Sequence, residues 1–558
     1  MKKNGISRIW KTLGIFGIIV PLQYIAVVLF NFLYTDNAVD TDTAKLLRHA
    51  MEMSENHTLN IRGWIHTTTM EWDTSALLSA PFNMIIHNIY ISTAIANCLI
   101  TLLFLCLIIL LYDRFGLKLR SALLACALFL IPYAFGMLDY YNLLMFGGAQ
   151  YVFRVMIPVM LLILIRTPES KRKSPGTIAL AMLCGILILI AAISSGLYIV
   201  VSCVLPVVFT VAVDALWYGS FRRYDIYQYT VCAIAFVLAA AGSIVSVRIG
   251  EASFGNSMSL LRWYDLRYYI DCMAEGYFRL MGAMPGAVPD ESIAVFSLRG
   301  IAFLIKLMIS FVMIIVMISG VRLIFQKKIS RDEIPDTDGD TGRSGHHKVI
   351  PDPHNDIRYY LCGVALFNLI ILLVCETRYN SQNTTLEYRY LLPVVIPLLL
   401  SVPVQIGKWE ASWSKLLKKT VGLILPLVIV YTTAVCYVDA HNGLDPYAYC
   451  YEIQKYVEAS GYDTVIFADD RGSAECLRLI DPDREYEAYS SSNGCMDIVD
   501  YYEAAMHADL YSDAHLLFVV TGTSLPDMIG EDKASHYTLR DSMLWFDIYE
   551  AWEFVLVE

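Results

Sequence analysis

The sequence predicts a polytopic α-helical membrane protein that ends in an α/β domain outside the bilayer. Of its 558 residues, 56% are hydrophobic and only 17% are charged, with a mean hydropathy of +0.51. The apolar residues gather in about eleven segments, each close to the roughly 20 residues that a spanning helix needs. After the last of these segments, short apolar runs alternate with helical patterns, which is typical of a water-soluble α/β domain.

The predicted spans follow one another from near the N-terminus to residue 438. In chain order they are Leu13–Leu33, Ile89–Tyr112, Leu119–Leu138, Tyr151–Ile165, Thr177–Ile193, Ile199–Trp217, Ile226–Val247, Leu298–Val321, Tyr359–Cys375, Tyr390–Ile406 and Thr420–Val438. The Ser194-Ser195-Gly196 sequence marks a turn between the fifth and sixth spans.

Lysine and arginine in the connections predict the orientation, because basic residues favour the cytoplasmic side. With the N-terminus in the cytoplasm, the cytoplasmic connections carry 24 basic residues and the opposite connections carry 11. We therefore expect a plasma-membrane protein with a transmembrane domain over 1–438, outer loops over 34–88 and 248–297, and an extracellular domain over 439–558. That last domain is acidic, with 25 Asp and Glu residues against 6 Lys and Arg residues.

The C-terminal domain is expected to contain a sheet with helices packed on it. Two helices are predicted, over Pro446–Ala459 and Ser473–Ile480. Four apolar runs predict strands, over Thr464–Ala468, Tyr486–Tyr489, Leu516–Val520 and Trp552–Val557.

The first outer loop opens with three acidic residues within seven positions, Asp36, Asp40 and Asp42. They lie at the N-terminus of a helix predicted over Thr41–Glu52. Its apolar residues recur at a spacing of three to four, which suits a helix lying on the outer leaflet with its apolar side down. Asp is favoured at helix N-caps, so capping is one explanation. Three carboxylates exceed what one cap requires, and Asp40 and Asp42 are therefore also candidates for catalysis.

A second acidic pair, Glu71 and Asp73, lies later in the same loop. Asp73 precedes a possible helix start, and capping again explains it. The functional alternative is that the two acidic clusters converge at the membrane surface. One carboxylate would then deprotonate an acceptor hydroxyl, while Glu71 and Asp73 would hold a divalent cation, Mg²⁺ or Mn²⁺, against a phosphate.

Two arginines, Arg378 and Arg389, lie on the outer side against the positive-inside bias. Arg389 follows Glu387 and Tyr388, so a simple ion pair with Glu387 is one interpretation. The alternative is an anion site, because the planar guanidinium binds phosphate through two parallel hydrogen bonds.

These segments together resemble the GT-C superfamily of integral-membrane glycosyltransferases, which includes protein O-mannosyltransferases and lipid A aminoarabinose transferases. Asp40-Thr-Asp42 with the helix up to Met53 resembles the acidic start and first juxtamembrane helix of that superfamily, and Ala80-Pro81-Phe82 resembles its Pro-Pro-Leu step. The run from Glu387 to Pro393 is similar to its Arg-Tyr-x-x-Pro element. The adjacent Asp-Glu of the superfamily is Asp-Thr-Asp here, so which carboxylate is the base stays open.

The resemblance implies an inverting transfer of a sugar from a polyprenyl-phosphate carrier to a surface glycan, lipid or protein. It implies Asp40 or Asp42 as the base and Arg389, Arg378 and Tyr388 at the donor phosphate. No nucleic-acid partner is expected. Two alternatives remain: a lipid or polysaccharide transporter, which would use charges within spans such as Lys306, Asp214 and Arg154, and a membrane scaffold whose outer domain binds a partner.

Overall fold

Most of the chain is described by the structure, a computed structural model. The described residues are 14–64, 69–136, 139–217, 226–249, 259–260, 266–283, 293–325, 356–376, 388–491, 495–497, 516–521 and 524–551. Arg378, Glu387 and the predicted strand Trp552–Val557 lie outside them.

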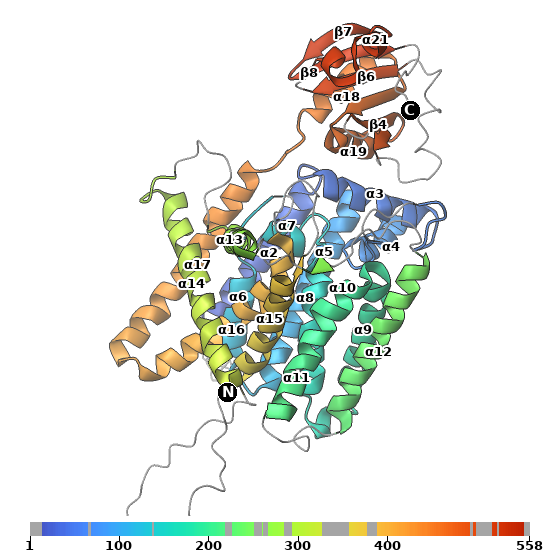
Figure 1. Ribbon diagram of the computed structural model, residues 1–558. Coiled ribbons are helices and arrows are strands. Elements are labelled where there is room, and N and C mark those ends of the chain that lie inside the picture. The colour runs from blue at the N-terminus through green and yellow to red at the C-terminus, as the bar shows by residue number, and fades with distance from the viewer. Residues whose placement is uncertain are drawn as a thin grey trace, which may run out of the picture.

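A bundle of long apolar helices forms the body of the protein (Figure 1). Within the described residues, nine helices are long and apolar enough to cross a membrane. They are α2 (Phe16–Tyr34), α5 (Ile89–Arg114), α9 (Pro175–Ser195), the continuous α10 (Leu197–Ile199), η2 (Val200–Val204) and α11 (Leu205–Trp217), α12 (Ile226–Ile249), α14 (Leu298–Phe325), α15 (Ile357–Val374), η6 (Tyr388–Leu391) with α16 (Leu392–Ser412), and α17 (Lys415–Asn442).

Two shorter apolar helices, α6 (Leu119–Phe129) and α8 (Val152–Ile165), coincide with the two remaining predicted spans. The predicted boundary of the first was wrong, since α6 ends at Phe129 and not at Leu138. Pro132 explains this end, because proline lacks an amide donor and disfavours helical geometry at the residue before it. The predicted turn at Gly196 is confirmed: Gly196 has φ +56° and separates α9 from α10.

Large apolar side chains cover the outward faces of these helices. Leu22, Met182, Val237, Met308 and Leu423 are all more than half exposed to the surroundings of the protein. Such a continuous apolar exterior requires a lipid environment, because monomeric soluble proteins rarely expose large contiguous apolar patches. The protein is therefore a multi-pass membrane protein.

The connections at one end of the bundle contain their own short elements. These are α3 (Thr41–Glu55), α4 (Ala76–Ile86), α7 (Tyr140–Leu144), α13 (Leu266–Leu280) and a small antiparallel pair, β1 (Ser259–Leu260) with β2 (Cys375–Glu376). A single turn, η1 (Glu169–Lys171), connects α8 to α9. Figure 1 shows α3 lying across the ends of the spans, next to the C-terminal domain.

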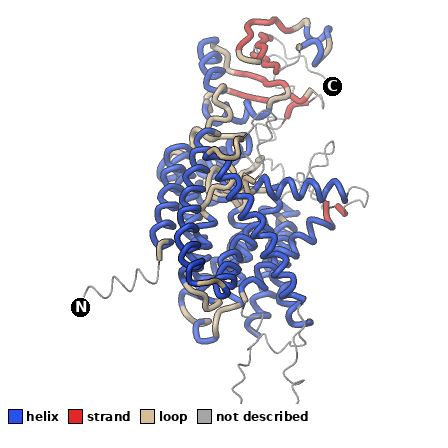
Figure 2. The backbone as a smooth tube through the Cα atoms, turned by 90° about the vertical axis from the view of Figure 1, so that its left-hand side faces the viewer, coloured by secondary structure: helices blue, strands red, loops and turns tan. Residues whose placement is uncertain are grey.

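The C-terminal domain is an α/β unit beyond the helix bundle (Figure 2). Its helices are α18 (Cys450–Ser460), α19 (Arg471–Ile480), α20 (Leu525–Ile529) and α21 (Glu531–Ala534). Its strands are β3 (Thr464–Ala468), β4 (Glu485–Ser490), β5 (Cys495–Asp497), β6 (Leu516–Thr521), β7 (Tyr537–Met543) and β8 (Phe546–Ala551), in the order β5-β4-β3-β6-β8-β7. The central strand β3 pairs in parallel with β4 and β6, and the other pairs are antiparallel.

The C-terminal domain packs on α3, which corrects the expectation that the apolar side of this helix faces lipid. Ala44, Leu47 and Ala50 are at most 2% exposed and share a core cluster with Cys476 and Leu477 of α19. The helix is therefore held between the membrane bundle and the C-terminal domain (Figure 1). An amphipathic pattern shows that one side is buried, but it does not show what covers that side.

Candidate functional site

Asp40 occupies the point where the chain leaves α2 and enters α3. Its backbone is extended (φ −112°, ψ 175°), and its carboxylate accepts a hydrogen bond of 2.8 Å from the amide of Thr43. The prediction of an N-cap at this position is confirmed. Only 4% of Asp40 is exposed.

Burial makes Asp40 an unusual carboxylate. Desolvation is the main cause that raises its pKa to about 7, the negative charge of Asp42 adds to this effect, and the hydrogen bonds of the cap oppose it. A carboxylate with a pKa near neutrality can both accept and release a proton at physiological pH.

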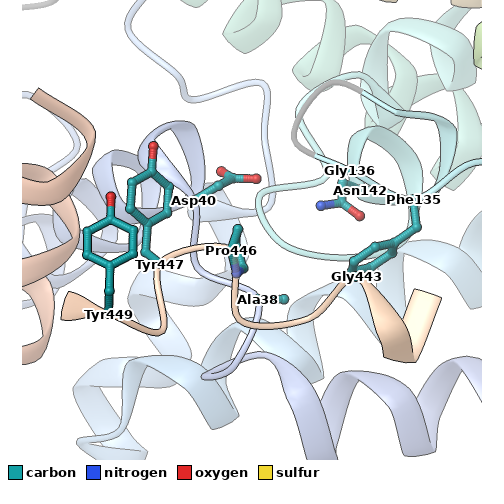
Figure 3. Close-up of a pocket in the computed structure, with 9 residues that line it drawn as sticks. All are labelled: Ala38, Asp40, Phe135, Gly136, Asn142, Gly443, Pro446, Tyr447 and Tyr449. Atoms are coloured by element: carbon teal, nitrogen blue, oxygen red, sulfur yellow. The ribbon is translucent and has the colours of Figure 1, made fainter. Parts of the chain in front are cut away.

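Asp40 lines a cavity of about 390 Å³ between the α3 end of the bundle and the C-terminal domain. The lining residues are Ala38, Asp40, Phe135, Gly136, Asn142, Gly443, Pro446, Tyr447 and Tyr449. They come from three segments far apart in sequence: the end of the α2–α3 connection, the connection around α7, and the linker into the C-terminal domain. Figure 3 shows the side chains of Asp40 and Asn142 facing each other across this space.

Two buried acceptor atoms at or next to the wall opposite Asp40 have no hydrogen-bond partner among the described residues. In the described part of the chain, the buried Oδ1 atoms of Asn142 and Asp139 accept no hydrogen bond. Asp139 does not line the cavity, but its carboxylate lies against the lining residue Gly136, where an added Cβ would be 2.5 Å from Oδ2. Unsatisfied buried acceptors are costly, so they point to a ligand or to water at this position.

Arg389 and Asp42 meet beside this cavity, although 347 positions separate them in the sequence. The Nη1 atom of Arg389 lies 3.5 Å from Oδ2 of Asp42, and both side chains remain partly exposed. Three of the predicted site residues, Asp40, Asp42 and Arg389, are therefore brought together at the first turn of α3.

Tyr388 connects Arg389 to two residues that the sequence analysis missed. Its hydroxyl is hydrogen-bonded to Asp139, and the guanidinium of Arg279 lies 4.7 Å from the centre of its ring. Burial raises the pKa of Asp139, while Arg279 opposes this shift. Arg279 lies in a connection predicted to be on the outer side, where the positive-inside bias disfavours arginine, and this signal could have identified it. Asp139 has no comparable local signal.

Asp73 lies in a different environment, where cationic and hydroxyl donors saturate it. Nε of Arg154 lies 2.8 Å from Oδ2, Ser195 donates to the same oxygen at 2.8 Å, and Ser194 donates to Oδ1 at 2.7 Å. Only 1% of Asp73 is exposed. The cluster ties the connection between α3 and α4 to α8 and α9.

Glu71 is also held by basic side chains. It forms an ion pair with Lys45, and Nδ1 of His49 lies 3.5 Å from Oε2. Burial alone would raise the pKa of Glu71, but Lys45 and His49 outweigh it and lower the pKa to about 2. His49 in turn stacks on Trp64, with ring centres 5.1 Å apart.

The contacts of Glu71 and Asp73 do not support the expected cation site. Neither residue lines the cavity, and a metal ion would have to displace an existing ion pair. Across the described ranges, no group of three or more His, Cys, Asp or Glu side chains is placed to hold a metal ion.

The charges within the spans also make specific contacts. Arg154 pairs with Asp73 as described, and Nζ of Lys306 donates to the carbonyl of Tyr133 at 3.1 Å. Asp214 is fully buried in α11. The contacts of Arg154 and Lys306 join spans to the connections at the α3 end of the bundle.

No family model and no curated protein sequence matches this chain. Solved structures do match it. Archaeal oligosaccharyltransferase AglB from Archaeoglobus fulgidus, in complex with an inhibitory peptide and a dolichol-phosphate, is 10% identical over 91% of this chain and 69% of its own, with a TM-score of 0.50. The Archaeoglobus fulgidus oligosaccharyltransferase in complex with Zn and sulfate is 10% identical over 90% and 68%, with a TM-score of 0.51.

These similarities establish the fold and leave the finer resemblance to mannosyltransferases or aminoarabinose transferases a prediction. AglB has a GT-C fold, and the match extends over both the helix bundle and the C-terminal region of this chain. The protein therefore has a GT-C-type fold, with a bundle of membrane-spanning helices and a C-terminal α/β domain.

Proposed function

We propose that this protein is a membrane glycosyltransferase that moves a sugar from a polyprenyl-phosphate carrier to an acceptor at the outer face of the plasma membrane. The observation that carries the proposal is Asp40, a buried carboxylate with a pKa of about 7 that lines a cavity at one end of a GT-C-type bundle. The dolichol-phosphate bound by AglB supports a lipid-phosphate donor.

In the proposed reaction, Asp40 accepts the proton of an acceptor hydroxyl. The acceptor oxygen forms a bond to the anomeric carbon of the sugar while the bond from that carbon to the phosphate oxygen breaks. Attack from the face opposite the leaving group inverts the configuration. Asp40 is assigned as the base rather than Asp42, because Asp40 lines the cavity whereas Asp42 pairs with Arg389.

The leaving phosphate carries negative charge and needs stabilisation. Arg389 contacts Asp42 at the first turn of α3, and we assign its guanidinium to the leaving phosphate. Arg279 and Tyr388 lie next to it and would extend the same anion site. Arg378 lies outside the described residues, and its role at the donor phosphate stays a prediction from the sequence.

The proposed orientation places the cavity and the C-terminal domain outside the cell. The span α2 leads into α3, which contacts the C-terminal domain, so the start of α2 and that domain lie at opposite ends of the bundle (Figure 1). An impermeant thiol reagent applied to intact cells should label Ser535→Cys in the C-terminal domain and not Lys173→Cys near η1, both of which are surface positions. The reverse pattern would contradict the orientation.

Asp40→Asn tests the proposed base directly. Asn caps helices about as well as Asp, so the variant should fold but lose transfer by roughly 10²- to 10⁴-fold. Transfer is measured with the full-length protein in liposomes that contain metabolically labelled lipid-linked sugars. Asp36→Asn, at an exposed position in the same loop, is the matched control and should stay active. Full activity of a folded Asp40→Asn protein would reject the assignment.

A divalent cation remains a separate prediction. Chelation with EDTA, followed by restoration of Mg²⁺ or Mn²⁺, tests it in the same assay. Activity that survives chelation shows that the chain's own side chains are sufficient, and loss that either ion restores shows that a cation takes part.

A further inference from the structure

We propose that a second cavity, at the far end of α3 from Asp40, binds a segment of a neutral glycan. The inference rests on the proposed function, because it assigns a binding site to the glycan part of a substrate. The cavity measures about 450 Å³. It is lined by Met51, Ser54, Glu55, His57, Asn83, Met84, His87, Asn88, Ile89, Tyr90 and Leu479.

Both parts of the protein build this cavity. Three elements of the membrane domain meet there: the last turns of α3, the end of α4 and the start of the span α5. The C-terminal domain adds Leu479 from α19. A ligand here would therefore contact both domains at the level where α5 begins.

Hydrogen bonds fix the framework of the cavity. Nδ2 of Asn83 donates to Oγ of Ser54 at 2.8 Å and ties α4 to α3. Oδ1 of Asn88 accepts from the amide of Ile91 at 3.0 Å and caps α5. Between these two, His87 adopts the left-handed conformation (φ 54°, ψ 35°) that ends α4. Histidine enters this region more often than most residues, but the geometry remains uncommon outside glycine.

The polar groups at this cavity are available to a ligand. In the part of the chain that the structure describes, the side chains of Glu55, His57 and His87 are exposed and form no hydrogen bond or ion pair. Together they offer a carboxylate acceptor and imidazole groups that can donate or accept. Sugar hydroxyls both donate and accept, so they match this mixture.

The remaining lining suits the apolar faces of sugar rings. Met51 and Met84 provide adaptable thioether surface, and Tyr90 provides an aromatic ring. Ligand sites commonly combine such apolar walls with a few polar groups that set orientation.

Other ligand classes fit less well. The lining contains neither Arg nor Lys, which anionic phosphate groups require for strong binding. The described residues include no group of three side chains placed to hold a metal ion. A purely apolar ligand would bury the polar groups without partners, at an energetic cost.

The distance between this cavity and Asp40 limits which part of a substrate can bind here. The 15 residues of α3 separate the two cavities, which corresponds to about 22 Å along the helix axis. A sugar at the second cavity is therefore not the one that reacts. It is a remote segment of an extended glycan, whose binding would hold a long substrate in place for transfer at Asp40.

A glycan array that displays neutral and phosphorylated oligosaccharides tests the inference, with full-length protein in detergent as the probe. The wild type should bind neutral glycans. The double variant Glu55→Gln/His87→Ala should bind them at least about tenfold more weakly, because it removes hydrogen-bonding groups from the site. Glu531→Gln/His536→Ala makes the same exchanges at exposed positions of the C-terminal domain and should bind like wild type. Thermal unfolding confirms that the variants are folded.

Three results would overturn the glycan site: no binding of any neutral glycan, binding confined to phosphorylated glycans, or unchanged binding in Glu55→Gln/His87→Ala. Asp40→Asn separates this inference from the proposed function. It should keep array binding while it loses transfer. Array binding alongside full transfer activity in Asp40→Asn would reject the proposed base and leave the glycan site intact.

Discussion

The two acidic pairs in the chain between α2 and α4, Asp40/Asp42 and Glu71/Asp73, look alike in sequence and differ in structure. Glu71 and Asp73 each meet a basic side chain, Lys45 and Arg154 respectively. Asp40 meets no basic side chain among its described contacts and is held by backbone amides. The pKa of Glu71 falls to about 2 and that of Asp40 rises to about 7.

This difference shows how partners decide the role of a buried carboxylate. Opposite charge keeps a carboxylate ionised and makes it a structural connector, whereas burial without a cation lets it exchange a proton near neutral pH. Proximity to the membrane or to a helix start does not distinguish the two cases. The comparison therefore assigns stability to the Glu71/Asp73 pair and proton transfer to Asp40.

The largest expected effect is a loss of stability when the buried ion pair between Arg154 and Asp73 is broken. Arg154→Gln would leave Asp73 buried without its cation, which costs about 3–5 kcal/mol in comparable cases. We expect poor yield and a lower unfolding temperature in detergent. The double variant Arg154→Gln/Asp73→Asn removes the stranded charge and should recover part of the loss. If Arg154→Gln were as stable as wild type, the stabilising role assigned to Asp73 would be wrong, and so would its contrast with Asp40.

Arg389 should affect donor use rather than folding. Arg389→Lys keeps the charge but loses the paired donors, and Arg389→Ala loses both, so donor affinity should fall in that order, by about 1.5–3 kcal/mol for the alanine variant. The measurement is KM for the lipid-linked sugar in liposomes. Unchanged KM in a folded Arg389→Ala protein would move the phosphate site toward Arg279 or Arg378.

Gly472 offers a smaller and more local test. The hydroxyls of Thr41 and Tyr447 lie 3.0 Å apart, and a Cβ on Gly472 would contact Tyr447 and lie 2.9 Å from Oγ1 of Thr41. Gly472→Ala should displace Tyr447, which lines the cavity with Asp40, and lower kcat several-fold with little change in folding. Gly407→Ala, where an added Cβ has open space, is the control. Equal kcat in both variants would show that this contact does not position the site.

Local patterns predicted the parts of the molecule that depend on local physics. Hydropathy located the spans, the Ser194–Gly196 turn separated two of them, and Asp40 was recognised as a helix start. Strand β7 was missed because nearly all its residues are exposed and no apolar alternation marks it. The covering of α3 by α19 and the contact of Asp139 with Tyr388 join distant segments, so no local pattern contains them.

The most direct test of the account is the pH dependence of single-turnover transfer, measured in liposomes between pH 5 and 8. The base must be deprotonated to act, so the rate should rise about tenfold per pH unit and level off above about pH 7, the pKa of Asp40. Asp42→Asn removes a like charge that raises this pKa and should shift the midpoint to lower pH. Asp40→Asn should be slow at every pH. A wild-type rate that does not change over this range, in protein that stays folded, would contradict Asp40 as the catalytic base.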